Sequence, residues 1–214
     1  MIKACIFDLD GVIVDTAHYH FLAWKRLANE LGFELTLADN ERLKGVSRMK
    51  SLEIVLELGG VQANEAERER LATRKNAWFQ EYVEEMAPEE IFPGVKELIG
   101  DLKAKGLQVG LASSSKNART VIRQLHIGNE FDAIVDGTMV VHSKPHPEIF
   151  LSTAQLLGVQ PEHCLVFEDA EAGVEAAIAA GMKCVGVGNE TLLHLADRVV
   201  SKTAEFQVAD LTQL

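Results

Sequence analysis

Short apolar segments alternate with helix-like segments along most of this chain, and this alternation restricts the possible folds more than any other feature. The apolar, strand-like segments are residues 4–7, 107–112, 133–135, 164–167 and 184–187. Between them lie segments whose apolar residues recur at three- and four-residue steps, as in amphipathic helices, namely 93–105, 118–125, 147–157 and 172–180. The alternation predicts a parallel sheet with helices on both faces. Because crossovers between parallel strands are right-handed, we expect an α/β protein with a doubly wound sheet. The last stretch, 198–214, predicts one more short strand and a short helix.

A block without strand-like runs interrupts this pattern between residues 16 and 86. Its apolar periodicity and its glycines predict helices over 16–31, 39–44, 48–58 and 64–86. We therefore expect a helical domain, 16–86, inserted into a core made of residues 1–15 and 87–214. A domain that is attached by two short connections can move as a lid over a site on the core.

The charge of the chain excludes some partners. It has 21 Lys and Arg residues against 32 Asp and Glu residues in a total of 214, a net charge of −11. No basic patch or stripe stands out, so nucleic acid is not expected as a partner. A phosphate-bearing substrate would need positive charge that is placed locally, by a few Lys or Arg side chains, helix N-termini or a metal ion.

The cysteines and the apolar runs indicate the compartment. Cys5, Cys164 and Cys184 lie in apolar strand-like segments, and their odd number and wide spacing give neither a disulfide framework nor a zinc site. Free buried thiols are typical of a reducing cytoplasm. Asp8 and Asp10 interrupt the first apolar stretch, which excludes a signal peptide, and no apolar run reaches the about 18 residues that a membrane span needs. We expect a cytoplasmic protein without membrane contact.

Polar groups follow four of the predicted strands at the points where these strands end. They are Asp8 and Asp10 after the first strand, residues 113–117 after the second, Lys144 downstream of the third, and Glu168 with Asp169 after the fourth. The carboxyl ends of parallel strands meet in one crevice, and ligands bind there. These side chains therefore predict one functional site.

Residue types at these strand ends indicate the chemistry. The carboxylates of Asp8, Glu168 and Asp169 are hard oxygen ligands that suit Mg²⁺. Ser113, Ser114 and the first amides of the following helix can hold phosphate oxygens, and Lys144 supplies a point charge. Two like charges 4 Å apart repel by about 4 kcal/mol at an effective dielectric of about 20. A carboxylate can approach a phosphate only if a cation and an ammonium offset that repulsion.

The motif set D-L-D-G-V, Ser, K-P and E-D at successive strand ends resembles the haloacid dehalogenase superfamily of phosphotransferases. The likeness covers essentially the whole chain, and the block 16–86 resembles the small cap of that superfamily. It implies that Asp8 is the nucleophile that becomes an aspartyl phosphate. It also implies that Asp10 is the general acid and base, and that its backbone carbonyl joins the metal shell.

The same resemblance assigns the remaining roles. Glu168 and Asp169 would hold Mg²⁺ together with Asp8 and Asp10, and Ser113 and Lys144 would bind the transferring phosphate. Within the superfamily, the segments 19–24, 43–48 and 74–76 make the cap most similar to those of its sugar-phosphate mutases. The residues expected to contact the sugar phosphate are Thr16, His20, Trp24, Gly45, Val46, Ser47, Arg48, Ser51, Lys75, Ser113, Ser114, Ser115, Lys116, Asn117 and Lys144.

Individual residues keep alternative interpretations. Arg48 has the planar fork suited to the phosphate that is not being transferred. His20 taken alone fits a packed helix position better than a ligand, and Trp24 fits core packing nearly as well. Two positions depart from the superfamily pattern: Ser114, where a smaller residue is usual, and Arg119 shortly after it. These departures leave the mechanism intact but could alter the shape of the pocket.

The resemblance leads to a ranked set of functions. The first is a monomeric, Mg²⁺-dependent mutase that interconverts β-glucose 1-phosphate and glucose 6-phosphate through a bound bisphosphate. The second is a sugar-phosphate phosphatase, in which water replaces the sugar hydroxyl as acceptor. A non-catalytic sugar-phosphate sensor is a remote third, because a sensor has no need of a nucleophile. Asp10 argues against dehalogenases and phosphonate-cleaving relatives, which lack a second aspartate, and no glycine-rich nucleotide motif is present. The sugar, its anomer and the isomer of the Lys144–Pro145 bond stay open.

Overall fold

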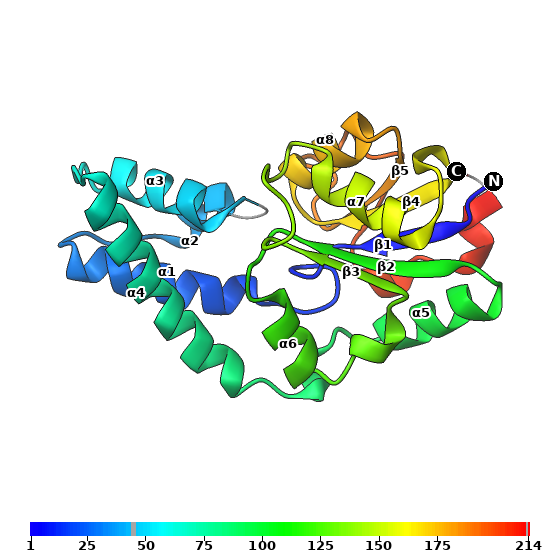
Figure 1. Ribbon diagram of the computed structural model, residues 1–214, viewed down its shortest axis with the longest axis horizontal. Helices are drawn as coiled ribbons and strands as arrows, with labels where there is room; N and C mark the ends of the chain where they lie inside the picture. Colours follow the sequence, from blue (N-terminus) through cyan, green and yellow to red (C-terminus); the bar gives the residue numbers. More distant parts are fainter. Residues whose placement is uncertain (44–45, 213) are drawn as a thin grey trace.

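Six parallel strands form the centre of the core, in the spatial order β3-β2-β1-β4-β5-β6. This computed structural model describes residues 1–43, 46–212 and 214 (Figure 1). The strands are β1 (Ala4–Phe7), β2 (Gln108–Ser113), β3 (Ala133–Asp136), β4 (Cys164–Glu168), β5 (Lys183–Val187) and β6 (Arg198–Val200). The predicted doubly wound parallel sheet is therefore confirmed. The order reverses between β1 and β4, which is where such sheets bind their ligands.

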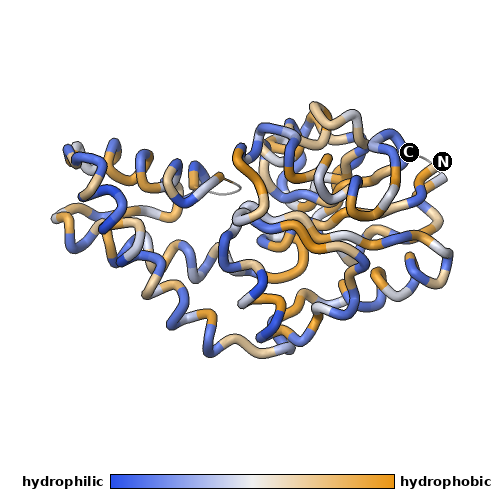
Figure 2. Tube along the Cα trace, viewed as in Figure 1, coloured by the Kyte–Doolittle hydropathy of each residue, from blue (hydrophilic) through white to orange (hydrophobic). Residues whose placement is uncertain are grey.

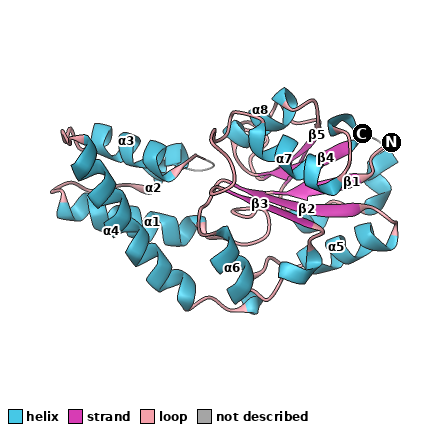
Figure 3. Cartoon of the chain, viewed as in Figure 1, coloured by secondary structure: helices cyan, strands magenta, loops and turns pink. Residues whose placement is uncertain are grey.

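Helices cover both faces of the sheet, as Figure 3 shows. Helices α5 (Val95–Ala104) and α6 (Ala118–Gln124) lie on one side, and α7 (Glu148–Leu157) and α8 (Glu171–Ala179) lie on the other. Successive residues of β1 alternate between the faces, as a pleated strand requires. Cys5 and Phe7 join the larger apolar cluster, whereas Ala4 and Ile6 join the cluster that includes α7 and α8.

A block of helices separates β1 from the rest of the core. It contains α1 (Ala17–Glu30), α2 (Leu37–Asn40), α3 (Arg48–Leu58) and α4 (Glu65–Glu84), and both α1 and α3 pack against α4 (Figure 1). The described residues between 17 and 86 contain no strand, as predicted. Hydrophilic residues are frequent along this block, whereas hydrophobic residues are concentrated along the strands (Figure 2).

One predicted helix was misplaced, and a capping residue explains where the helix actually begins. The segment 39–44 was predicted to be helical, but α2 begins at Leu37 and ends at Asn40, followed by a 3-10 turn (Glu41–Leu43). Thr36 caps the start, because its hydroxyl accepts the Asp39 N–H while the Asp39 carboxylate accepts the Thr36 N–H. Residue 44 lies outside the described residues. The predicted C-terminal helix is instead two 3-10 helices, Thr203–Glu205 and Val208–Thr212.

The two segments that connect the helical block to the core lie side by side. Gly11, with φ of +76°, allows a tight turn after β1, in which the Gly11 N–H donates to the Val14 carbonyl. Val14 then forms an antiparallel bridge with Ile91, and the Phe92 N–H donates to the Ile13 carbonyl at 2.8 Å. Adjacent connections of this kind form a hinge region, and we propose the division 1–15 and 87–214 against 16–86 on this basis.

Candidate active site

Three carboxylates converge at the carboxyl ends of β1 and β4. Ligand oxygens of Asp8, Glu168 and Asp169 all lie within 4.8 Å of one another. Two glycines make this approach possible, because a Cβ at Gly11 would overlap the Asp169 carboxylate and a Cβ at Gly173 would overlap that of Glu168. Three converging carboxylate oxygens match the hard oxygen ligands of a divalent cation such as Mg²⁺, so the residues present fit that ion.

Lys144 neutralises two of these acids from within the core. Its fully buried ammonium donates to Asp8 Oδ1 and, at 2.8 Å, to Glu168 Oε2. Burial alone would lower the pKa of Lys144, but the two carboxylates outweigh it and raise the pKa above its usual value. The two carboxylates therefore favour the charged form of Lys144 beside Asp8. The Lys144–Pro145 peptide bond is cis.

Asp10 has a different environment two residues further on. Its backbone N–H donates to Asp8 Oδ2 at 3.0 Å, while its own Oδ1 is buried without a hydrogen-bond partner among the described residues. Burial and then the nearby charge of Asp8 raise the pKa of Asp10. Burial likewise raises the pKa of Glu168, although Lys144 opposes that effect. An acid whose pKa lies near neutrality can both give and take a proton, which is what a general acid and base must do.

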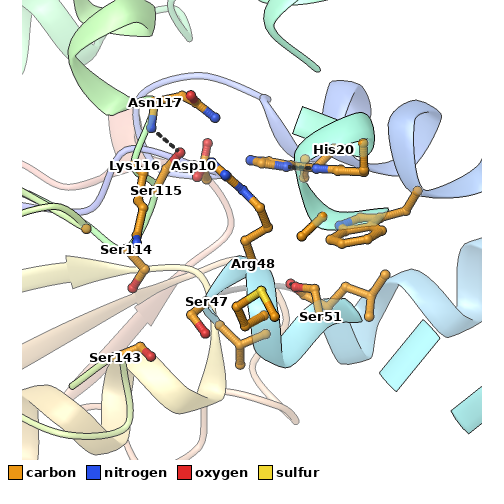
Figure 4. Close-up of a pocket in the computed structure, with 18 of the residues that line it drawn as sticks. Asp10, His20, Ser47, Arg48, Ser51, Ser114, Ser115, Lys116, Asn117 and Ser143 are labelled. Carbon is orange, nitrogen blue, oxygen red and sulfur yellow. Dashed lines mark hydrogen bonds between the residues drawn. The ribbon is translucent and has the colours of Figure 1, made fainter. Parts of the chain in front are cut away.

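The loop after β2 forms a second wall of the site. The Ser113 hydroxyl accepts the Ser115 N–H and the Ser115 hydroxyl accepts the Asn117 N–H, both at 3.2 Å. The latter bond is the dashed line in Figure 4. These bonds curl the loop into the start of α6. The Ser114 hydroxyl is buried without a partner among the described residues.

A cavity of about 440 Å³ separates this wall from the helical block. Figure 4 shows Arg48 extending from the start of α3 toward Asp10, with Ser47 beside it. Its guanidinium is partly buried, and this burial lowers the pKa of Arg48. Basic and polar groups thus face the core acids across the cavity.

A second buried lysine lies on the helical side of the cavity. Lys75 Nζ lies 2.6 Å from His20 Nδ1, and 4.6 Å and 4.9 Å from the ring centroids of Trp24 and Phe79. The His20 ring stacks on Phe79 at 3.9 Å. Burial first, and then the charge of Arg48, lower the pKa of Lys75 well below its usual value. Burial and the neighbouring Lys75 do the same to the pKa of His20.

The cavity brings together most of the residues predicted from the sequence. The predicted residues that line it are Asp8, Asp10, His20, Trp24, Val46, Ser47, Arg48, Ser51, Lys75, Ser114, Ser115, Lys116, Asn117 and Asp169. Ser113, Lys144, Glu168 and Thr16 are buried and do not line it. Gly45 lies outside the described residues.

Other lining residues were not predicted as site residues. They are Ala17, Asn40, Leu43, Met49, Glu69, Ala72, Thr73, Gly137, Val140, Val141 and Ser143. Ala72 lies three residues before Lys75 and Glu69 lies three residues before Ala72, so helical spacing could have placed Ala72 beside Lys75 and Glu69 beside Ala72 on α4. Nothing in the sequence alone points to Asn40 or to the loop 137–143.

Asn117 was expected to contact the sugar phosphate, but in this structure its side chain contacts the helical block. Its amide nitrogen donates to Asn76 Oδ1 at 2.7 Å, and its amide oxygen accepts from Gln80 Nε2 at 3.4 Å. Both partners are on α4, so this predicted substrate ligand connects the two blocks of the protein in this structure.

The fold and the acid cluster together define a phosphotransferase class, and comparison with known proteins gives the family. A model of the haloacid dehalogenase-like hydrolases matches residues 2–181. The chain therefore belongs to this family, as its motifs predicted.

Comparison with individual relatives shows how similar this chain is to particular enzymes. The chain is 47% identical over 205 residues to β-phosphoglucomutase of Bacillus subtilis, a match that covers 95% of this chain and 91% of the relative. It superposes on the crystal structure of β-phosphoglucomutase from Clostridium difficile with a TM-score of 0.95 and 43% identity, over 100% and 96% of the two chains. A phosphorylated carbohydrates phosphatase of Thermotoga maritima is 35% identical, over 85% of this chain and 82% of that protein. Within the described residues, no helix combines the length and apolarity required to span a membrane.

Proposed function

We propose that this enzyme interconverts β-D-glucose 1-phosphate and D-glucose 6-phosphate by Mg²⁺-dependent phosphoryl transfer through Asp8. The observation that carries the proposal is a cavity that has the acids Asp8 and Asp10 on the core side and the basic groups of Arg48 and Lys75 on the helical side. Lys144 stands beside the nucleophile on the core side, and Arg48 and Lys75 stand on the helical side. The identities of 47% and 43% to proteins named β-phosphoglucomutase support this choice of substrate.

The chemical step needs a nucleophile and a proton donor on the same strand end. A carboxylate oxygen of Asp8 forms a bond to phosphorus while the bond from phosphorus to the sugar oxygen breaks. Protonated Asp10 gives its proton to that leaving oxygen and, in the return step, takes one from the accepting hydroxyl. The raised pKa of Asp10 supports this dual role.

Charge neutralisation accounts for the remaining groups around Asp8. The Lys144 ammonium offsets the repulsion between the Asp8 carboxylate and an incoming phosphate. Asp8, Glu168, Asp169 and the Asp10 carbonyl would hold Mg²⁺, which when bound supplies further positive charge to the transferring group. Ser113 and the curled loop that follows it would orient the phosphate oxygens.

The mutase reaction differs from hydrolysis because two phosphates must be held in turn. When the phosphoryl group passes from Asp8 to a free hydroxyl of the sugar monophosphate, a sugar bisphosphate forms, and this bisphosphate must then present its other phosphate to Asp8. Arg48, Lys75 and the residues Ser115 to Asn117 would then hold the phosphate that is not reacting. A phosphatase of the same family needs only the site at Asp8, and the 35% identity to a phosphatase keeps hydrolysis as the second candidate.

One sample distinguishes these functions. We would follow phosphorus NMR spectra of the enzyme with Mg²⁺, β-glucose 1-phosphate and a trace of glucose 1,6-bisphosphate. A glucose 6-phosphate signal that replaces the starting signal supports the proposal. Accumulation of inorganic phosphate without isomerisation would show that the enzyme is a phosphatase and not a mutase. An unchanged spectrum would reject both functions. Asp8→Asn should abolish every change, whereas Asp101→Asn, on the exposed side of α5, should not.

Arg48 provides the sharper test of two-phosphate binding. We expect Arg48→Ala to lower mutase turnover by about a hundredfold, because a partly buried, charge-assisted phosphate contact is lost. Hydrolysis of p-nitrophenyl phosphate, which carries one phosphate, should fall by less than about threefold. Arg42→Ala is the matched control, since Arg42 is an exposed cap arginine paired with Glu57 at 3.5 Å. Equal losses in both assays would contradict the role of Arg48.

The expectations about oligomeric state, compartment, cofactor and substrate class also stay predictions. We expect a monomeric, cytoplasmic enzyme with Mg²⁺ as its cofactor and a small sugar phosphate as its partner. Gel filtration with light scattering tests the first of these, and activity after chelation followed by addition of Mg²⁺ tests the metal.

A further inference from the structure

Arg119 occupies a position that its own helix does not favour. It is the second residue of α6, and the first turn of a helix carries the positive end of the helix dipole. A cation there is unfavourable unless something else compensates for it. The compensation comes from outside the helix, because Arg119 Nε donates to Asp136 Oδ2 at 2.7 Å.

Asp136 is a buried carboxylate at the end of β3, and its side-chain hydrogen bonds join the loop after β3 to α6. Its side chain is 1% exposed, whereas that of Arg119 is 61% exposed. Oδ1 accepts the Thr138 N–H at 2.8 Å and the Thr138 hydroxyl, and Oδ2 accepts from Arg119. The carboxylate thereby holds the beginning of the loop 137–143 against α6. A buried charge of this kind is stable only while it is paired.

The two segments that this ion pair connects are both walls of the cavity. The loop 113–117 leads into α6, and the loop 137–143 leads from β3 to Lys144. They also touch directly, because the Gly137 N–H donates to the Ser115 carbonyl at 3.3 Å. A Cβ at Gly137 would overlap the Ser114 carbonyl, so no larger residue fits between them.

The far end of the second loop has its own anchor. The Glu148 carboxylate, at the start of α7, accepts the Val141 N–H at 2.9 Å and the His142 N–H at 2.8 Å. Between these two anchors the loop presents Gly137, Val140, Val141 and Ser143 to the cavity. The position of the loop 137–143 relative to the loop 113–117 thus depends on Arg119 at one end and on Glu148 at the other.

We propose that Arg119 and Asp136 act as a positioning pair that sets the distance between the two core walls of the cavity and so determines how tightly the phosphate end of the substrate is held. Neither residue lines the cavity. They act through Gly137, Ser115 and the loop 137–143. The inference rests on the proposed function only in taking the cavity as the phosphate site.

The test compares Arg119→Ala with Arg123→Ala, an exposed arginine on the same helix. For each we would measure kcat and KM for β-glucose 1-phosphate, the Kd of inorganic phosphate by calorimetry, and the midpoint of thermal unfolding. Arg119→Ala should raise KM and the phosphate Kd by about tenfold and lower kcat by less than about threefold. The ion pair of Asp8 and Lys144 is not in contact with Arg119, which is why kcat changes less.

Further variants separate positioning from simple stabilisation. Asp136→Asn should reproduce the Arg119→Ala effect, and the double variant should be no worse than either alone, because the pair acts as one unit. Arg119→Lys, which restores the charge, should recover most of the phosphate affinity. Unchanged KM and phosphate Kd in Arg119→Ala, a lowered melting midpoint alone, or an equal effect in Arg123→Ala would each overturn the proposal.

Phosphate binding also separates this inference from the proposed function. If the parent protein does not turn over β-glucose 1-phosphate but Arg119→Ala still weakens phosphate binding, the substrate is wrong and the positioning pair stands. If turnover is normal and phosphate affinity is unaffected by Arg119→Ala, the pair is wrong and the function stands.

Discussion

Among the described residues, two lysines are almost completely buried, Lys75 and Lys144, and their surroundings are opposite. Lys144, in the core, lies between the carboxylates of Asp8 and Glu168. Lys75, in the helical block, lies between the rings of Trp24 and Phe79 with His20 as its hydrogen-bond partner. None of the ion pairs found among the described residues involves Lys75. Lys144 thus has two carboxylate counter-ions within the protein, whereas the described residues form no ion pair with Lys75.

The pKa directions follow from this difference. Two carboxylates raise the pKa of Lys144 despite its burial, whereas burial and the charge of Arg48 lower the pKa of Lys75. Aromatic faces stabilise a cation by only about 0.5–2 kcal/mol, much less than an ion pair and its hydrogen bonds can supply in the same interior. An anion that bound beside Lys75 would therefore stabilise its charged form.

The comparison suggests how one enzyme serves two phosphates. The core lysine is part of a fixed set that stays charged through the reaction. We expect the lysine of the helical block to gain a close counter-ion when a phosphate enters, so that its contribution to binding is available to substrate. Predictions about the two lysines should consequently differ in the sign of their effect on stability as well as in their effect on activity.

Removal of Lys144 should have the largest effect. Lys144→Met leaves two buried carboxylates unpaired, and we expect the free energy of unfolding to fall by about 3–5 kcal/mol. Turnover should fall by about a thousandfold, because the charge that allows a phosphate to approach Asp8 is lost. Urea unfolding and steady-state assays measure the two effects.

Lys183→Met is the matched control for this variant. Lys183 also belongs to the core and pairs with Asp197 at 2.6 Å, but its side chain is 47% exposed, so we expect a loss below about 1 kcal/mol. If both variants lose the same stability, burial is not what distinguishes Lys144, and the comparison fails.

Lys75→Met should separate activity from stability. Methionine fills a similar volume among the rings, so we expect the free energy of unfolding to stay within about 1 kcal/mol of the parent or to rise. Turnover should still fall by at least about tenfold, because the amine that would carry the positive charge for the second phosphate is gone. Arg70→Met, an exposed position on the same helix, should change neither.

The pH dependence of stability sharpens this prediction. The folded-state pKa of Lys75 is lowered, so between it and the unfolded value of 10.5 the unfolded chain binds the extra proton. The parent should therefore gain stability relative to Lys75→Met as the pH rises toward 10.5, by at most about 1.4 kcal/mol per pH unit. Urea unfolding of both proteins from pH 7 to pH 10 measures this gain. A constant difference across that range would show that Lys75 is charged in the folded state.

The sequence was most informative about the core, for a geometrical reason. Asp8, the loop after β2, Lys144 and Glu168 follow strands whose carboxyl ends must meet in a parallel sheet, so their convergence could be predicted from strand positions alone. The helix α3 was also predicted with its observed bounds, because its apolar periodicity ends at Gly59; in the structure the Ser47 side chain caps its start.

The contacts between distant segments could not be predicted in this way. Asn117 binds Asn76 and Gln80, which lie on another block of the protein, and Arg119 pairs with Asp136 across two loops. Periodicity and spacing describe only one element at a time. Arg119 was visible as a departure from the family pattern, but its partner was not, because nothing in the sequence aligns residue 119 with residue 136.

His20 gives the smallest of the expected effects and tests the polar partner of Lys75. Its pKa is lowered well below 6.5 by burial and by Lys75, so it stays neutral in the folded protein when the unfolded chain already takes up a proton. That difference removes stability as the pH falls below 6.5, by at most about 1.4 kcal/mol per pH unit. His20→Gln keeps an acceptor for Lys75 but cannot titrate, so its stability should fall less than that of the parent between pH 6.5 and pH 5. His18→Gln, at an exposed position on the same helix, controls for the substitution. If His20→Gln and the parent lose equal stability over this range, His20 is protonated in the folded protein, and Lys75 must then be the neutral partner of the pair.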